Sequence, residues 1–267
     1  MNQFGLIFRH YIKRIFMDKV SLGLQLGLPI FLIVIMPNLQ GGFPEVPEAG
    51  DLWARVAVNF IISFGFFGGQ YAMGHIFDDL KDTRKWRMLM APVEARTYTL
   101  AAMAGSMIVS FVQSMLILIA AMLFTSANFT GLIPMLIVTL ILMNLLSHAF
   151  CYFFVVVCNK YATANAITNV AMIGLAALGG GIIMGIDMIV DLPAFSFVHD
   201  YMTPLSIGNQ IMTHGAGMIT NDMMTAGEFL RVSETNWNLA LMNIGFLIGL
   251  TVLFSCLSFV ARKVKRV

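Results

Sequence analysis

The chain has 267 residues, of which 58% are hydrophobic and only 11% are charged, and its formal net charge is +2. Soluble domains carry a charge on roughly a quarter of their residues, so a soluble protein of this size could not hide so much apolar surface in its core. The composition excludes an ordinary soluble domain and predicts an all-α protein that crosses a lipid bilayer several times.

The first segment, residues 1–19, is basic and has the pattern of an amphipathic helix. Apolar side chains recur at helical spacing and basic side chains lie on the opposite side: Phe4, Ile7, Phe8, Tyr11, Ile12 and Ile15 against Arg9, His10, Lys13 and Arg14. This pattern predicts a helix that lies in the membrane interface. In a second interpretation, which stays open, the basic residues only fix the topology.

Six apolar runs follow, each of a length that suits the hydrocarbon core, which needs about 20 residues of helix. The first is short, with 17 residues before Pro37. The predicted spans are residues 20–36, 56–77, 100–124, 132–158, 166–189 and 237–260. No linker or repeat divides them, so we expect one transmembrane domain over residues 1–267.

The basic residues predict the orientation of these spans, because Lys and Arg stay on the cytoplasmic side. All but two of the 16 Lys and Arg residues fall before the first span, after the second, after the fourth or after the sixth. The exceptions are Arg55 and Arg231. We therefore expect both termini in the cytoplasm.

Two of the connections are long enough to have a structure of their own. On the cytoplasmic side, Asp78–Thr97 carries charges of both signs around Trp86, and Pro92 favours a helix end. Because Trp and Arg often anchor interfaces, the loop predicts a short helix presented to a partner; a membrane-anchoring Trp86 is the alternative. On the outer side, the apolar segment Leu192–Met212 is interrupted by prolines and predicts re-entrant or interfacial half-helices.

The sequence contains no constellation of an enzyme. It has no HExxH, no GxSxG and no P-loop, and no Gly is followed by Lys. We therefore predict no catalytic, cofactor-binding or metal-binding residue, and no nucleic-acid partner. Polar residues within the spans are candidates for a substrate path or for hydrogen bonds between helices: Gln113, Asn144, His148 and Asn169.

The layout resembles the membrane subunits of ABC-2-type (type V) ATP-binding-cassette exporters, near the daunorubicin-exporter permease branch. The resemblance rests on the N-terminal segment, the acidic-then-basic loop that runs into Ala91-Pro92-Val93, the glycine-rich fifth span and the prolines after it. It implies that residues 1–19 are a connecting helix and Asp78–Ala91 a coupling helix that contacts an ATPase. The implied coupling residues are Asp78, Asp79, Asp82, Thr83, Trp86, Arg87 and Pro92. Asp82 and Ala91 depart from the Gly and the hydroxyl residue that are typical there.

The resemblance further implies a separate ATPase subunit that holds ATP and Mg, and a second membrane subunit that is either a copy or a paralogue. The assembly would export an amphipathic or hydrophobic substrate across a bacterial-type plasma membrane. A six-span secondary carrier or channel is the alternative, although charges are scarce in the spans and the halves show no inverted repeat. A membrane enzyme and a non-transporting receptor or immunity protein are weaker alternatives.

Overall fold

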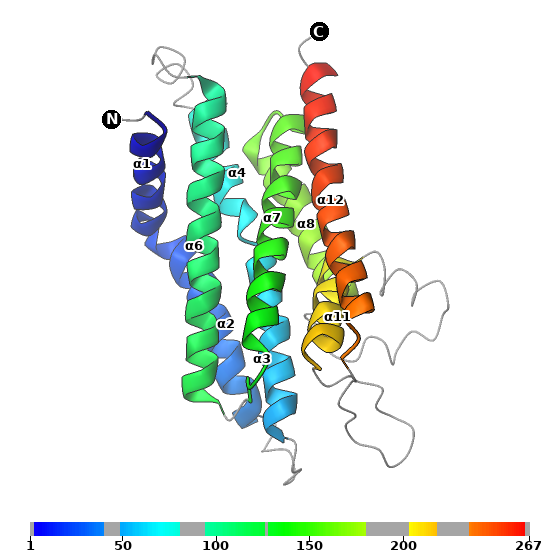
Figure 1. Ribbon diagram of the computed structural model, residues 1–267. Helices are drawn as coiled ribbons and strands as arrows, with labels where there is room; N and C mark the ends of the chain where they lie inside the picture. Colours follow the sequence, from blue (N-terminus) through cyan, green and yellow to red (C-terminus); the bar gives the residue numbers. More distant parts are fainter. Residues whose placement is uncertain are drawn as a thin grey trace.

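The computed structural model describes residues 3–39, 49–80, 94–125, 128–179, 203–217 and 235–264, and these contain helices and no strands. The helices form a bundle with both termini at the same end, which we call the terminal end (Figure 1). Five helical segments are long and apolar enough to cross a membrane, or six if the bent pair α1–α2 counts as one. The predicted all-α polytopic membrane fold is confirmed.

The N-terminal segment forms α1 (Gln3–Met17), and α2 (Lys19–Leu39) follows at an angle of 66°. Asp18 lies at the bend, where its carboxylate accepts a hydrogen bond from the backbone N–H of Ser21 (3.2 Å) and caps the start of α2. One stripe of α1 is buried: Ile7, Tyr11 and Ile15. The predicted amphipathic helix thus packs part of its apolar face on the bundle, mainly on α6 (Ala95–Phe124).

The predicted second span, residues 56–77, is interrupted. It consists of α3 (Ala49–Phe66) and α4 (Gly69–Leu80), separated by a turn at Phe67 and Gly68. The hydroxyl of Ser147 bridges the break: it donates to the carbonyl of Phe66 and accepts from the N–H of Gly69. Because Ser147 belongs to α7 (Ile133–Val157), a neighbouring helix satisfies the backbone groups that the break exposes.

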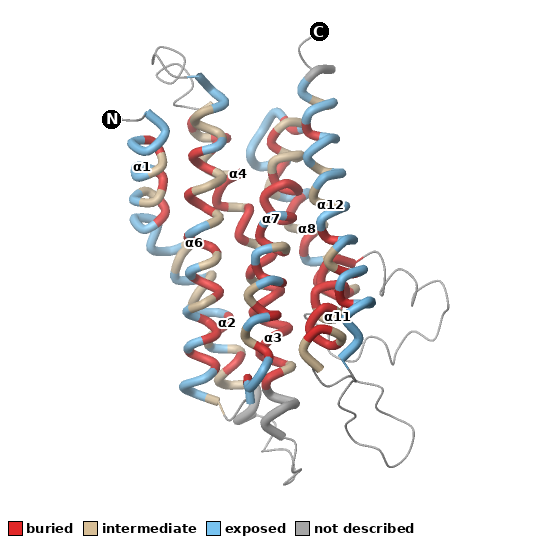
Figure 2. Tube along the Cα trace, in the orientation of Figure 1, coloured by how far each residue is buried: buried red, intermediate tan, exposed pale blue. Residues whose placement is uncertain are grey.

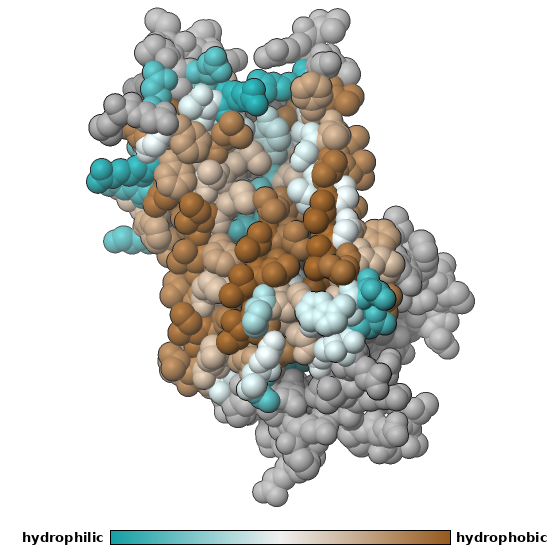
Figure 3. All heavy atoms as spheres, in the orientation of Figure 1, coloured by the Kyte–Doolittle hydropathy of each residue, from teal (hydrophilic) through white to brown (hydrophobic). Residues whose placement is uncertain are grey.

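Burial differs strongly between the spans (Figure 2). In the segment Ala54–Leu80, 83% of the residues in the apolar stretch are buried, whereas in Trp237–Arg262 the share is 11%. The second span is therefore central, and α8 (Tyr161–Leu178) and α12 (Trp237–Val264) present apolar side chains outward. A band of apolar surface covers the middle of the visible face (Figure 3), as expected of a protein in a bilayer.

The outer region contains one described helix, α11 (Pro204–Ala216), which overlaps the end of the predicted segment Leu192–Met212. At 13 residues it is about 20 Å long, too short for a core of about 30 Å. It is nevertheless buried, with Leu205, Ile207, Ile211 and Met212 fully enclosed by α3, α7 and α12. Residues 180–202, which contain the rest of the predicted half-helices and the end of the fifth span, lie outside the described residues.

The other span boundaries differ slightly from those predicted. The helix of the third predicted span, α6, begins at Ala95, before the apolar run at Leu100, since its first turn is polar and a hydropathy pattern does not include it. The fourth and sixth predictions, 132–158 and 237–260, correspond to α7 and α12. The helix α8 begins at Tyr161, five residues before the predicted fifth span.

Candidate functional site

The first candidate site is an ionic junction at the terminal end of the bundle, where α1 meets α4. Arg14 on α1 contacts two adjacent carboxylates on α4, Asp79 through Nη1 (2.9 Å) and Asp78 through Nη2 (2.6 Å). The hydroxyl of Tyr11 donates a hydrogen bond to the other carboxylate oxygen of Asp79. We call these four residues the α1–α4 junction.

Two residues of the junction, Tyr11 and Asp79, are almost fully buried. Asp79 is 1% exposed and Tyr11 is 1% exposed, whereas the Asp78 side chain is half exposed. A buried carboxylate is costly unless it is paired and hydrogen-bonded, and Asp79 has both kinds of partner. Burial, followed by the hydrogen bond to Asp79, raises the pKa of the Tyr11 phenol, so the phenol keeps the proton that it donates.

Helix electrostatics explain why a cation is needed here. Asp78 and Asp79 occupy the last turn of α4, where the partial negative charge of the helix C-terminus disfavours carboxylates. The guanidinium of Arg14 offsets this unfavourable placement. The junction therefore fixes α1 to the end of α4, at the start of the predicted coupling segment Asp78–Ala91, whose first residues, up to Leu80, belong to α4.

The structure describes two of the predicted coupling residues, Asp78 and Asp79, and both belong to the junction. The others lie outside the described residues: Asp82, Thr83, Trp86, Arg87 and Pro92. Their role in coupling stays a prediction. Sequence reasoning placed Tyr11 only on the apolar face of α1 and Arg14 on the opposite side. The signal that links them is their spacing. Because they are three residues apart on a helix, their side chains are neighbours and can bind the same carboxylate.

The second candidate site is a layer of polar side chains between the central helices. Asn144 on α7 accepts a hydrogen bond from Ser110 (3.0 Å) and donates one to the carbonyl of Met107 (2.8 Å), both on α6. His148 lies one turn further along, with Nδ1 2.8 Å from the carbonyl of Asn144 and Nε2 2.8 Å from the hydroxyl of Ser106. A carbonyl only accepts, so Nδ1 carries a proton, while the Ser106 hydroxyl at Nε2 also lies 2.9 Å from the carbonyl of Ala102.

The remaining two candidates of the predicted substrate path join the second span to its neighbours. Gln113 on α6 donates to the hydroxyl of Tyr71 on α4 (2.9 Å). Asn169 on α8 accepts from the amide of Gln70 on α4 (2.6 Å). All four polar residues therefore form hydrogen bonds between helices, the second interpretation offered for them. Their role in a substrate path stays a prediction, and the serine and tyrosine partners were not identified from the sequence.

Within the part of the chain that the structure describes, no cluster of His, Cys, Asp or Glu is placed to hold a metal ion. Cys151 and Cys158 are buried thiols, and Cys256 lies on the outer side of α12.

The comparison with known families agrees with this architecture. A family model described as ABC-2 family transporter protein matches residues 44–260, from before the start of α3 to near the end of α12. No curated protein matches the chain. The chain belongs to the ABC-2 family of transporter proteins and is a membrane permease component of an ABC transporter, a role that implies a partner ATP-binding subunit.

Proposed function

We propose that the chain is the membrane subunit of an ATP-driven exporter whose ATP is hydrolysed by the partner subunit. The loop that follows α4 would contact that partner and transmit its movement to the second span. Both termini would lie in the cytoplasm, in a bacterial-type plasma membrane. The complete transporter would contain two membrane subunits and two ATPases, with ATP and Mg bound by the latter.

The α1–α4 junction is the observation that supports this proposal best. A force applied to the loop reaches Asp78 and Asp79 first, and Arg14 and Tyr11 connect these carboxylates to α1. The same α4 helix packs on α6 and α7 and contacts α8. A movement of the loop is thereby distributed over several spans, which is what coupling between an ATPase and a permeation path requires.

The composition of the spans supports a cargo of amphipathic or hydrophobic character. Polar groups in the middle of the described spans are mainly amides and hydroxyls, together with His75 and His148, and most of them already form hydrogen bonds. A carrier driven by ions or protons generally places ionisable groups inside the membrane. This scarcity favours energy supplied from outside the spans over the alternative carrier or channel.

The test is to substitute the coupling loop in the assembled transporter. The partner is first identified as the P-loop ATPase that co-purifies with the chain from its native membrane. Trp86→Ala should then weaken this complex or uncouple hydrolysis from transport, by about 2 kcal/mol or more. Arg87→Glu should slow association in a salt-dependent manner.

The matched control is Arg9→Glu, a charge reversal on the exposed side of α1. It should leave association and transport unchanged. If Trp86→Ala and Arg87→Glu both behave like wild type in co-purification and ATP-dependent transport, the loop is only a juxtamembrane anchor, and the carrier alternative is favoured.

A further inference from the structure

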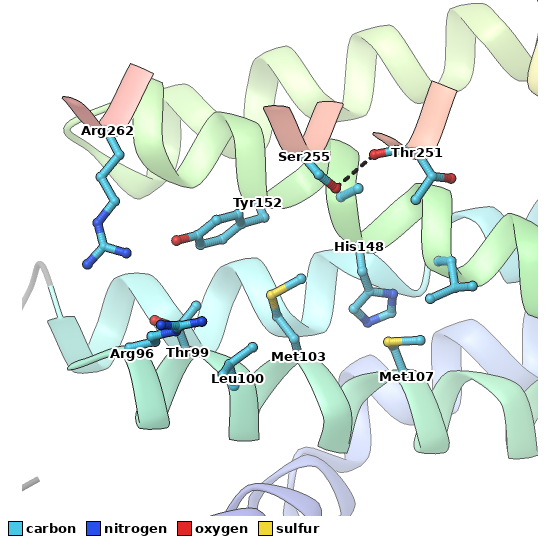
Figure 4. A pocket seen from close by; sticks show the side chains of 12 residues that line it. Arg96, Thr99, Leu100, Met103, Met107, His148, Tyr152, Thr251, Ser255 and Arg262 are labelled. Atoms are coloured by element: carbon cyan, nitrogen blue, oxygen red, sulfur yellow. Dashed lines mark hydrogen bonds between the residues drawn. The ribbon is translucent and has the colours of Figure 1, made fainter. Parts of the chain in front are cut away.

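A groove between α6, α7 and α12 opens at the side of the bundle and has no role in the proposed coupling. It has a volume of about 320 Å³, roughly ten times the volume that one water molecule occupies in the liquid. Its polar end is formed by Arg96 on α6, Arg262 on α12 and Tyr152 on α7, and its depth by Met103, Met107 and His148 (Figure 4).

The two arginines give this groove a positive charge that no salt bridge among the described residues balances. Both are exposed, and neither forms a salt bridge with any residue that the structure describes. No acidic side chain is among the described residues that line the groove. An occupant with an anionic group at this end would pair with both charges, and guanidinium groups are suited to phosphate because they donate two parallel hydrogen bonds.

The neighbouring hydroxyls do not compete for the same anion. The side chains of Thr99, Thr251 and Ser255 each donate to a backbone carbonyl of their own helix, at 3.0, 2.8 and 2.8 Å. The donors that remain are the guanidinium groups and the phenol of Tyr152, which lie together at one end of the groove (Figure 4). The polar contacts of the groove are thus concentrated at one place.

The rest of the groove is mainly apolar, and its length matches one leaflet. From Arg96 to Met107 the helix rises about 16 Å, about half of the hydrocarbon core of roughly 30 Å. Leu100 and Met103 line the intervening wall on α6, and Leu145 and Ala149 line it on α7. Because methionine side chains are flexible, this wall can adapt to an acyl chain.

We propose that this groove binds an anionic phospholipid from the leaflet on the terminal side of the bundle. The phosphate would lie between Arg96 and Arg262 with Tyr152 as a further donor, and one acyl chain would run past Met103 toward Met107. A basic pocket between transmembrane helices at the membrane surface is the kind of site that retains anionic head groups. The site does not depend on the ATPase partner or on the direction of transport.

The test is native mass spectrometry of the purified full chain, after removal of lipid, with phosphatidylglycerol and phosphatidylcholine of identical acyl chains. Wild type should retain one phosphatidylglycerol per chain in preference to phosphatidylcholine. The double variant Arg96→Gln/Arg262→Gln should lower the affinity for phosphatidylglycerol by about tenfold or more, because charge-assisted hydrogen bonds to phosphate are lost. Affinity for phosphatidylcholine should stay the same.

The matched control is Arg9→Gln/Lys160→Gln, which also removes two exposed positive charges but none from the groove. It should bind phosphatidylglycerol like wild type. Glycerol 3-phosphate, which has the head-group charge but no acyl chain, should not stabilise the chain against heat. The proposal is wrong if wild type does not prefer phosphatidylglycerol, if both double variants lose affinity equally, or if glycerol 3-phosphate stabilises as well as the lipid does.

Discussion

At the scale of single residues, Arg14 and Asp79 form the more buried of the two salt bridges among the described residues. Asp79 is almost fully buried, and its carboxylate pairs with the Arg14 guanidinium and accepts a hydrogen bond from Tyr11. Removing one partner of a buried pair leaves an uncompensated charge, which costs more than the pair itself contributes. The two partners of Asp79 should therefore differ in their effects when they are substituted.

We expect Arg14→Gln to lower the free energy of unfolding by about 3 kcal/mol or more, because it removes one partner of a buried ion pair. Tyr11→Phe should cost less, about 1.5–3 kcal/mol for a hydrogen bond to a charged group. Adding Asp79→Asn to Arg14→Gln should recover part of the loss, since the buried charge is then absent. Thermal unfolding in detergent measures all three, with exposed Lys13→Gln as the control; additive losses in the double variant would show that the ion pair does not couple these residues.

Asn144 and His148 test the two interpretations of the polar layer. Replacing both with Leu removes the side-chain bonds to Ser110, to the Met107 carbonyl and to Ser106. If they serve only to join α6 to α7, the double variant should lose roughly 1 kcal/mol per bond and keep its transport rate per assembled complex. If they line the substrate path, transport should fall by more than the loss of assembled protein explains. Transport and thermal stability are measured on the same preparation.

At the scale of elements, the break in the second span depends on close approach by its neighbours. A Cβ at Gly69 would lie 2.5 Å from the backbone oxygen of Ser147, and a Cβ at Gly68 would lie 2.1 Å from Oγ of Ser110. Neither position therefore has room for a side chain. The contact at Gly69 is the more rigid, since a backbone atom of α7 cannot rotate away as a side chain can.

Gly69→Ala should destabilise the bundle by about 1–3 kcal/mol, the usual range for overpacking. Gly174→Ala on α8 is the control, because its Cβ would meet nothing within 4 Å and alanine favours a helix over glycine by about 1 kcal/mol. Melting temperatures of the two variants check this prediction. Equal effects would mean that α4 and α7 separate easily at the break.

At the scale of the whole molecule, the termini lie at one end of the bundle (Figure 1), and the distribution of Lys and Arg predicts which side of the membrane that end faces. In a variant without native cysteines, single cysteines at Val46 and Thr220 should react with an impermeant thiol reagent added outside intact cells. Cysteines at Thr83 and Val267 should react only after the membrane is permeabilised. Labelling of Val267→Cys from outside intact cells would contradict the predicted topology.

The sequence by itself determined that the protein lies in a lipid bilayer, that its fold is all-α, and approximately where its spans lie. These properties follow from transfer of each apolar stretch into lipid, a free energy that sums along the chain and needs no knowledge of neighbours. The family resemblance was also accessible, because the order of spans and loops is itself a linear pattern, and the match over residues 44–260 confirms it. The α1 helix was predicted from its apolar and basic spacing alone.

Only the tertiary structure decided which residues meet. Tyr11 and Asp79 are 68 positions apart, and Ser147 and Gly69 are 78 apart; their contacts depend on the rotation and depth of each helix, which a hydropathy pattern does not record. The break before Gly69 is hidden in the sequence because both halves are apolar, and α7 supplies the compensating hydroxyl. The groove beside Arg96 and Arg262 likewise exists only because α6 and α12 bring together charges 166 residues apart in the chain.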